Sequence, residues 1–328
     1  MKKNLYLKEI DVLKGIGIIL VVIGHSFPDA SAVSGISNAF ARTIYNIIYS
    51  FHMPAFIFAS GLVSYKFQIS FNDKINAILK KFDRLIIPYI IWAIIYIPFR
   101  IILAKYSSQK FVVNRLWQVF IGNNPYSGLW FLYSLFFISV LHIIFIDNKN
   151  KLIKAFIISA IFALTNDFIE YKEPIKWIFA YSIYFYLGIL FRQHYSKFYN
   201  VFIKKQVLIK IFVIFVASFV TKIILSKFEI ESFVLIPAVL GTILLYSISL
   251  QLKNNNFFRM IGSYSMDIYI LSGPILVALR IFLYNILKIN YGLYAILAII
   301  LSILLSFMVS SKIIRKSKSL AFLLLGMR

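Results

Sequence analysis

Long apolar runs separated by short basic segments dominate this sequence. Each run has about 20 residues, enough for one helix to cross the ~30 Å hydrocarbon layer of a membrane. With 61% hydrophobic and 14% charged residues, the chain is far more apolar than the ~45–50% typical of soluble domains. We therefore predict an all-α polytopic membrane protein with about ten transmembrane helices, in one domain over 1–328. The predicted spans are 10–28, 42–65, 84–104, 128–147, 152–169, 174–191, 207–226, 232–251, 264–287 and 291–313.

Two features of the composition exclude other classes of function. The chain has no cysteine, so disulfides, thiolate metal sites and a cysteine nucleophile are excluded. Its net charge of +23 could suggest nucleic acid, but the basic residues are spread between the apolar runs instead of forming one basic face. We therefore expect membrane lipid, and no nucleic acid, among its partners.

The distribution of lysine and arginine predicts the orientation in the membrane. Most basic residues fall before the first span, after the last, and in every second gap between spans. The positive-inside rule then places both termini in the cytoplasm. We expect the chain in the plasma membrane. The first span lacks a cleavage site and should stay in the mature protein. The long gap at 105–127 breaks the pattern, and its segment 111–121 is predicted as a helix in the outer interface.

The first predicted span contains ionisable residues. Lys14 and His25 are eleven residues apart, within about 20° of one helical face and about 16 Å apart along the axis. Asp11, three residues before Lys14, lies on the same stripe. Ionisable groups inside a membrane cost at least ~2.5–3.5 kcal/mol each and mark a working site by default. Alternatively, Asp11 and Lys14 reach the cytoplasmic headgroups and His25 only caps the outer end.

The second predicted span adds His52, the helix-breaking Pro54 and the small residue Ser60. Two histidines at similar depth on adjacent helices could form one pocket. A metal site would need a third ligand at that depth, and His142 and His194 fall near the cytoplasmic face, so we expect no metal.

Three further features each allow a functional and a structural interpretation from the residues alone. Lys80, Lys81 and Arg84 open the third span at its cytoplasmic mouth, as a positive-inside anchor or as a clamp for a phosphate-bearing ligand. Trp130 stands at an outer helix start, in an aromatic belt or in a pocket wall. Asp267, close to Tyr269, is more typical of a structural carboxylate than of a catalytic one.

Five sequence elements together resemble the membrane-bound acyltransferase family 3. They are Asp11-x-x-Lys14 with Gly24-His25, Phe51-His-Met-Pro54 with Ser60-Gly61, Arg84-Leu-Ile-x-Pro-Tyr89, Leu129-Trp-Phe-Leu132 and Gly262-x-Tyr-Ser-x-x-Ile-Tyr269. The resemblance covers residues 8 to about 275 in family order. Within the family, the chain is most similar to the fucose 4-O-acetylase-like and exopolysaccharide O-acetyltransferases.

The resemblance implies transfer of an acetyl group from cytoplasmic acetyl-CoA to a hydroxyl of a cell-surface or exported carbohydrate. It implies His25 as the catalytic histidine, Lys14 as its basic partner and Arg84 as a contact for the coenzyme. Lys80 and Lys81 would join Arg84 and Lys14 around the coenzyme phosphates. His52 would position or polarise the acceptor. The acceptor pocket would include the following residues: Asp11, Ser60, Trp130 and Tyr269.

Several alternatives stay open at this point. His25 could act as a general base or as an acyl carrier. The donor could be a succinyl or another acyl group, since the acyl chain leaves no readable mark. The chain could also be a glycan transporter or flippase, although no inverted repeats are visible. The assembly state, a homodimer included, is not fixed by the sequence.

Overall fold

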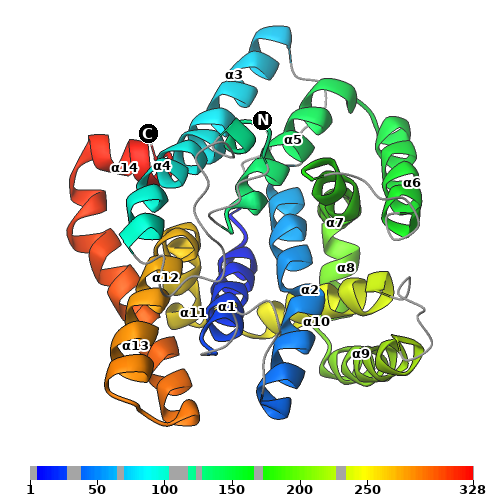
Figure 1. Ribbon diagram of the computed structural model, residues 1–328. Coiled ribbons are helices and arrows are strands. Elements are labelled where there is room, and N and C mark those ends of the chain that lie inside the picture. The colour runs from blue at the N-terminus through cyan, green and yellow to red at the C-terminus, as the bar shows by residue number, and fades with distance from the viewer. Residues whose placement is uncertain are drawn as a thin grey trace. The chain divides into compact units, whose positions relative to one another are not determined.

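A computed structural model describes residues 6–27, 38–64, 70–102, 117–122, 128–165, 173–226 and 234–327. Within these ranges the regular structure is helical and no strand is present (Figure 1). The predicted all-α class is therefore confirmed. Of the predicted interfacial helix at 111–121, only 117–121 belong to the described residues, and 117–119 form a 3₁₀ turn.

Besides the 3₁₀ turn at 117–119, fourteen α-helices and three other helical segments are present in the described part of the chain. The α-helices are α1 (Lys8–His25), α2 (Ala39–Val63), α3 (Phe71–Lys81), α4 (Ile87–Ile102), α5 (Trp130–Phe145), α6 (Lys149–Thr165), α7 (Ile175–Gln193), α8 (Tyr195–Phe202), α9 (Lys205–Ser226), α10 (Leu235–Gln251), α11 (Asn256–Ser263), α12 (Ser265–Leu279), α13 (Tyr291–Lys312) and α14 (Lys318–Leu325). The π-helical segments η1 (Phe82–Ile86) and η5 (Arg280–Ile286) and the 3₁₀ segment η6 (Ile314–Lys316) connect some of them.

Each of the ten predicted spans overlaps one of these helices. By length and composition, five helical stretches of the described residues can cross a membrane: Ala39–Val63, Phe71–Phe99, Lys205–Leu225, Ser265–Ile286 and Tyr291–Lys316. The helices Trp130–Phe145 and Leu235–Gln251 are apolar but shorter. Helix α1 is less apolar because it carries Lys8, Glu9, Asp11 and Lys14. The count of ten spans stays a prediction.

The chain forms two compact units, each built from separate stretches of sequence. Unit 1 comprises Met1–Gly24, Asn38–Tyr65 and Tyr184–Tyr269, and unit 2 comprises His25–Ser37, Lys66–Ile183 and Ile270–Arg328. The boundary between them falls at the last residue of α1. The prediction of a single domain stays a prediction.

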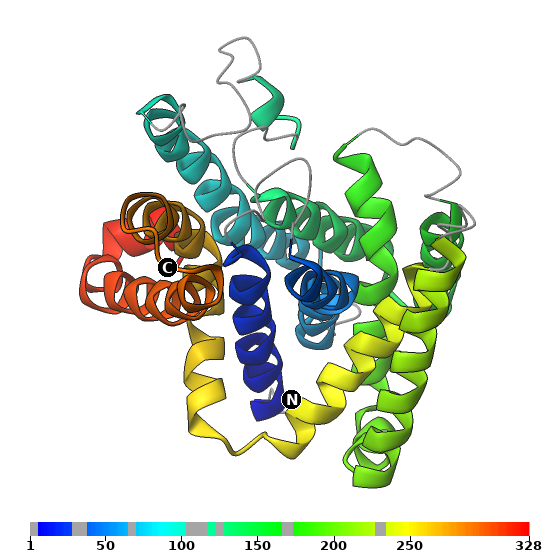
Figure 2. The ribbon, with the colours of Figure 1, turned by 60° about the horizontal axis from the view of Figure 1, so that its bottom comes forward.

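In unit 1, α1 lies beside α2 in both views (Figures 1 and 2). A Cβ atom on Gly17 would lie 3.1 Å from the Phe56 ring, and one on Gly24 would lie 2.7 Å from the Tyr49 ring. Gly24 follows Gly17 by seven residues, whereas Tyr49 precedes Phe56 by seven residues. The two helices therefore pack antiparallel and contact each other along the same face after two turns. Farther along α2, its buried residues pack against α10, where Phe58 meets the ring of Tyr246 at 5.6 Å.

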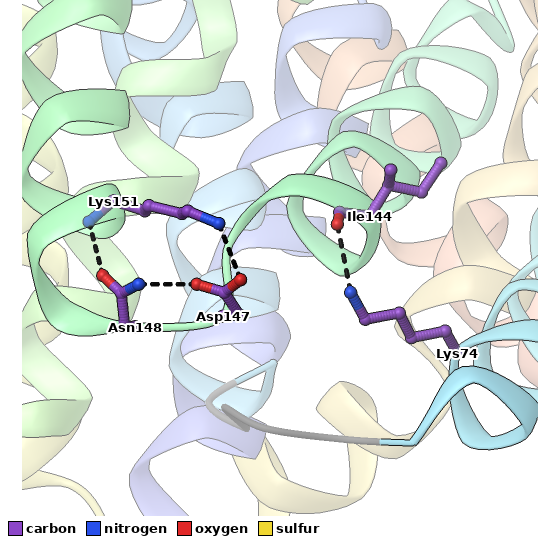
Figure 3. A network of polar contacts seen from close by, with 5 residues as sticks. All are labelled: Lys74, Ile144, Asp147, Asn148 and Lys151. Atoms are coloured by element: carbon purple, nitrogen blue, oxygen red, sulfur yellow. Dashed lines mark hydrogen bonds and ion pairs between the residues drawn. The ribbon is translucent and has the colours of Figure 1, made fainter.

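In unit 2, polar contacts join α3 to the end of α5 and cap the start of α6 (Figure 3). Lys74 of α3 donates from Nζ to the carbonyl oxygen of Ile144, 3.1 Å away in the last turn of α5. Asn148 accepts from the backbone N–H of Lys151 at 2.9 Å, which caps the start of α6. The Lys151 ammonium also pairs with Asp147 at 2.7 Å, and this partner holds the pKa of that carboxyl below its ordinary value.

Candidate functional site

Helix α1 carries the predicted ionisable stripe. Lys14 Nζ lies 2.8 Å from Asp11 Oδ1, with side chains 32% and 13% exposed. The hydroxyl of Tyr6 donates to Asp11 Oδ2, so both carboxylate oxygens have partners. His25 is the last residue of α1, and its side chain is exposed. As predicted, Asp11 and Lys14 lie together near one end of the helix, and His25 lies at the other.

Close backbone contacts hold the Lys14 end of α1 against α11. A Cβ atom on Gly15 would lie 2.1 Å from the carbonyl oxygen of Phe258, and one on Gly262 would lie 1.8 Å from that of Asp11. Neither distance leaves room for a side chain, so the two backbones touch at this crossing. The late Gly262 element of the sequence is thus a packing partner of the first helix, which sequence reasoning missed.

His52 sits on the buried face of α2 and is 3% exposed. Its Nδ1 lies 2.8 Å from the carbonyl oxygen of Ile48, and its ring meets Tyr49 edge-on at 4.7 Å. A carbonyl can only accept, so Nδ1 donates this hydrogen bond. Ser60, two turns farther along α2, donates to the Phe56 carbonyl at 3.0 Å.

The basic cluster predicted as a phosphate clamp lies at the end of α3 and in η1. Lys80 is exposed and Lys81 is half-buried. Arg84 donates from Nη1 to the carbonyl oxygen of Leu325, 2.7 Å away at the end of α14. The following Gly326 is left-handed, with φ of 60°, and a Cβ atom there would lie 2.3 Å from the Asp83 carbonyl oxygen. Arg84 therefore also fixes the end of α14, a contact the sequence analysis did not predict.

The aromatic residues predicted for the acceptor pocket have different surroundings. Trp130 stacks on Trp177 of α7, with ring centroids 4.8 Å apart, and meets Tyr181 at 5.1 Å. Tyr269 is half-buried on α12, two residues after the fully buried Asp267.

A buried polar contact near the start of α1 also went unpredicted. The Tyr195 hydroxyl of α8 donates to Glu9 at 2.6 Å, and the Glu9 residue is only 3% exposed. Burial raises the pKa of Tyr195 above its ordinary value, and the Glu9 carboxylate raises it further. In the sequence Glu9 is one acidic residue within a basic flank, so only its place in the first helical turn marked it out.

The described residues contain no group of three or more His, Cys, Asp or Glu side chains that could hold a metal ion. Apolar helices of membrane-spanning length define a polytopic membrane protein, and α1 carries a stripe of ionisable residues.

Residues 7–311 match the family described as "Acyltransferase domain", acyltransferase family 3, and the chain belongs to that family. It is therefore a membrane acyltransferase, of the class that transfers groups other than amino-acyl groups. No curated protein and no solved structure matches the chain.

Proposed function

We propose that this acyltransferase moves an acetyl group from cytoplasmic acetyl-CoA to a hydroxyl of a cell-surface or exported carbohydrate. The observation that supports this most is the layout of α1, with the Asp11–Lys14 ion pair near one end and His25 at the other. The separation, about 16 Å along the axis, suits a donor whose polar phosphates and reactive thioester are far apart. The enzyme would work in the plasma membrane with both termini cytoplasmic.

His25 is the proposed general base. Its imidazole takes the proton of the sugar hydroxyl while the oxygen attacks the thioester carbonyl, which forms the new C–O bond. The tetrahedral intermediate then collapses, the C–S bond breaks, and the proton passes to the leaving thiolate. Such catalysis is worth typically ~10²–10⁴-fold. His25 is an exposed residue at the end of α1, and this supports the assignment.

An acyl-histidine intermediate is the alternative for the same residue. In that route the His25 nitrogen attacks the thioester, coenzyme A leaves, and the sugar hydroxyl then takes the acetyl group from the ring. Single-turnover kinetics with radiolabelled acetyl-CoA separates the two routes. A burst of protein-bound label before acceptor is added indicates the acyl-enzyme, and its absence indicates the general base.

The donor phosphates are assigned to the basic residues. Lys14 of α1 would contact these phosphates. So would three residues at the end of α3 and in η1: Lys80, Lys81 and Arg84. Arginine forks match phosphate oxygens bidentately, while lysine acts as a point charge. Arg84 donates from Nη1 to the carbonyl oxygen of Leu325, and a guanidinium has five N–H donors in all, so the two roles are compatible.

The acceptor is assigned to the remaining polar and aromatic residues. His52 would act through Nε2, since Nδ1 donates to the Ile48 carbonyl. The stacked Trp130 ring offers the apolar face against which a sugar ring could pack. The other assigned residues are Asp11, Ser60 and Tyr269. We place the enzyme with the fucose 4-O-acetylase-like and exopolysaccharide O-acetyltransferases.

The test compares surface glycans from deletion and wild-type cells by mass spectrometry. Wild-type glycans should carry one additional acetyl mass per modified sugar, and the deletion strain should lack it. His25→Ala expressed in the deletion strain should restore less than about one hundredth of the acetylation. His194→Ala, a histidine outside the proposed site, should restore it fully. Acetylation by His25→Ala at the wild-type level would reject the catalytic assignment.

The same strains decide the donor. If the modified sugars carry a succinyl mass instead of an acetyl mass, the donor is succinyl-CoA and not acetyl-CoA. The assignments of the site residues would then be unchanged. The transporter alternative has no support, because the chain belongs to a family of acyltransferases.

A further inference from the structure

A second cation, Arg259, stands where α11 crosses α1. At this crossing the backbone of Gly15 meets the carbonyl of Phe258, and that of Gly262 meets the carbonyl of Asp11. Lys14 directly precedes Gly15 in the chain, and Arg259 directly follows Phe258. The crossing therefore brings one lysine and one arginine, from helices far apart in the sequence, to the same level of unit 1.

Tyr6 links the two cations. Its hydroxyl donates to Oδ2 of Asp11, whose Oδ1 pairs with Lys14. The bond to Asp11 and partial burial raise the pKa of Tyr6, and the nearby Arg259 guanidinium opposes that rise. One connected polar group thus runs from Lys14 through Asp11 and Tyr6 to Arg259. We call these four residues the crossing cluster.

The crossing cluster has more positive than negative charge. Asp11 is the only carboxylate in it, and Asp11 already pairs with Lys14. Arg259 donates from Nη1 to the neutral side-chain oxygen of Asn256 at 3.2 Å. Its Nε is buried and has no hydrogen-bond partner among the described residues. The neighbouring acid on α1, Glu9, is buried against Tyr195 and faces a different partner.

A buried guanidinium nitrogen without a partner costs free energy unless a ligand or water satisfies it. A lysine and an arginine in a cluster with a single carboxylate favour an anion that accepts several hydrogen bonds. A phosphate group fits both requirements, because the guanidinium fork can bind two of its oxygens and the ammonium can neutralise the charge.

We propose that Arg259 and Lys14 form a subsite for a phosphate group, and that this phosphate belongs to the coenzyme A donor. The inference rests on the proposed function, since it assigns a further binding residue to the same donor. An anionic phospholipid headgroup carries the same chemistry, so the experiment has to distinguish the two sources.

The test uses the full chain in nanodiscs of phosphatidylcholine, titrated with coenzyme A by calorimetry. Arg259→Gln should raise the Kd for coenzyme A roughly tenfold or more, the loss expected for one charge-assisted hydrogen bond. Arg259→Lys should recover part of the affinity. Lys205→Gln, which removes an exposed cation at the start of α9, is the matched control and should leave the Kd unchanged.

A second arm repeats the titration in nanodiscs that also contain phosphatidylglycerol and measures the lipid that copurifies with each variant. A coenzyme A effect of Arg259→Gln in both kinds of nanodisc supports the coenzyme as the source. Loss of bound phosphatidylglycerol, with an unchanged coenzyme A Kd, assigns the subsite to a lipid headgroup and overturns the coenzyme assignment. No effect on either ligand overturns the subsite.

Arg259→His guards against a purely structural effect on folding. The histidine is a cation only below about pH 6.5, so its coenzyme A affinity relative to wild type should improve as the pH falls through that value. A ratio that does not change with pH means that Arg259 only supports the fold, and it overturns the inference.

Failure of the proposed function gives a different result. If wild type binds coenzyme A and Arg259→Gln does not, while no glycan is acetylated, the subsite stands and the acceptor assignment fails. If glycans are acetylated and Arg259→Gln binds coenzyme A like wild type, the subsite alone fails. If wild type does not bind coenzyme A, both the donor assignment and the subsite fail.

Discussion

Arg84 donates a hydrogen bond through Nη1 to the carbonyl oxygen of Leu325, 2.7 Å away. The contact joins η1 to the last turn of α14, where the carbonyls have no intrahelical partners and a cation is favourable. Trp92 adds a second bond, from Nε1 to the Leu324 carbonyl at 2.9 Å. A residue proposed to bind the donor therefore also holds the end of α14, and the two roles can be separated by substitution.

Arg84→Gln is expected to lower both stability and donor binding. It removes a charge-assisted bond to α14, worth about 1.5–3 kcal/mol, and a guanidinium from the proposed clamp. Thermal unfolding in detergent and coenzyme A titration measure the two effects.

Trp92→Phe is the matched control for the structural role. It removes a neutral bond to the same turn of α14, worth about 0.5–1.5 kcal/mol, and should leave the coenzyme A Kd unchanged. Equal coenzyme A affinities for Arg84→Gln and wild type would show that Arg84 serves α14 alone.

Gly262→Ala is expected to destabilise the protein and to impair function. The new Cβ would lie 1.8 Å from the Asp11 carbonyl oxygen, so α11 and α1 must move apart. Overpacking of this kind typically costs about 1–3 kcal/mol, which unfolding in detergent can measure.

Gly292→Ala provides the comparison for that substitution. Its Cβ would find only Asn290 Oδ1, at an ordinary 3.9 Å, near the start of α13. It should be neutral or stabilising by up to about 1 kcal/mol. Equal stability of the two variants would contradict the close crossing of α1 and α11.

His52 offers a test of its two ring nitrogens. An asparagine amide can replace Nδ1–H as donor to the Ile48 carbonyl, whereas a glutamine amide reaches toward the position of Nε2. If Nε2 serves the acceptor, His52→Asn should lose activity by at least about tenfold while keeping the wild-type melting temperature.

The reverse result would change the role of His52. His52→Gln should be the less stable variant, because it loses the bond to Ile48, and it should keep more activity per folded molecule. Full activity of His52→Asn in glycan acetylation would reduce His52 to a helix-stabilising residue.

Asp147 should titrate below its ordinary range. The Lys151 ammonium lowers its pKa in the folded protein, so the pair stabilises the fold above the unfolded pKa of about 3.9. This contribution is lost as the pH falls through the folded value. Carboxylate NMR of Asp147 should show a higher pKa in Lys151→Gln than in wild type. An unchanged value would mean that the ion pair does not form in solution.

The helices could be predicted because their signals are local. The apolar runs predicted ten spans, and each span overlaps a helix. The three-residue spacing of Asp11 and Lys14 predicted that they share one helical face. The ion pair between those side chains follows from that spacing alone.

The contacts between distant segments could not be predicted from the sequence. The bond from Arg84 to Leu325 joins residues 241 positions apart, and no local pattern encodes that pairing. Gly326 after a leucine-rich run was a usable signal, since glycine commonly follows a helix end in the left-handed conformation. It could locate the end of α14 but not the surface on which that end packs.

The glycine contacts of α1 constrain how the proposed acetyl transfer can proceed. Gly17 and Gly24 meet rings of α2 on one side, and Gly15 meets the backbone of α11 on another. Rotation of α1 about its axis would drive its side chains into both α2 and α11. We therefore expect α1 to keep its orientation relative to these two helices. In the proposed mechanism both substrates would then approach a stationary His25, and the moving part would be the flexible arm of the donor.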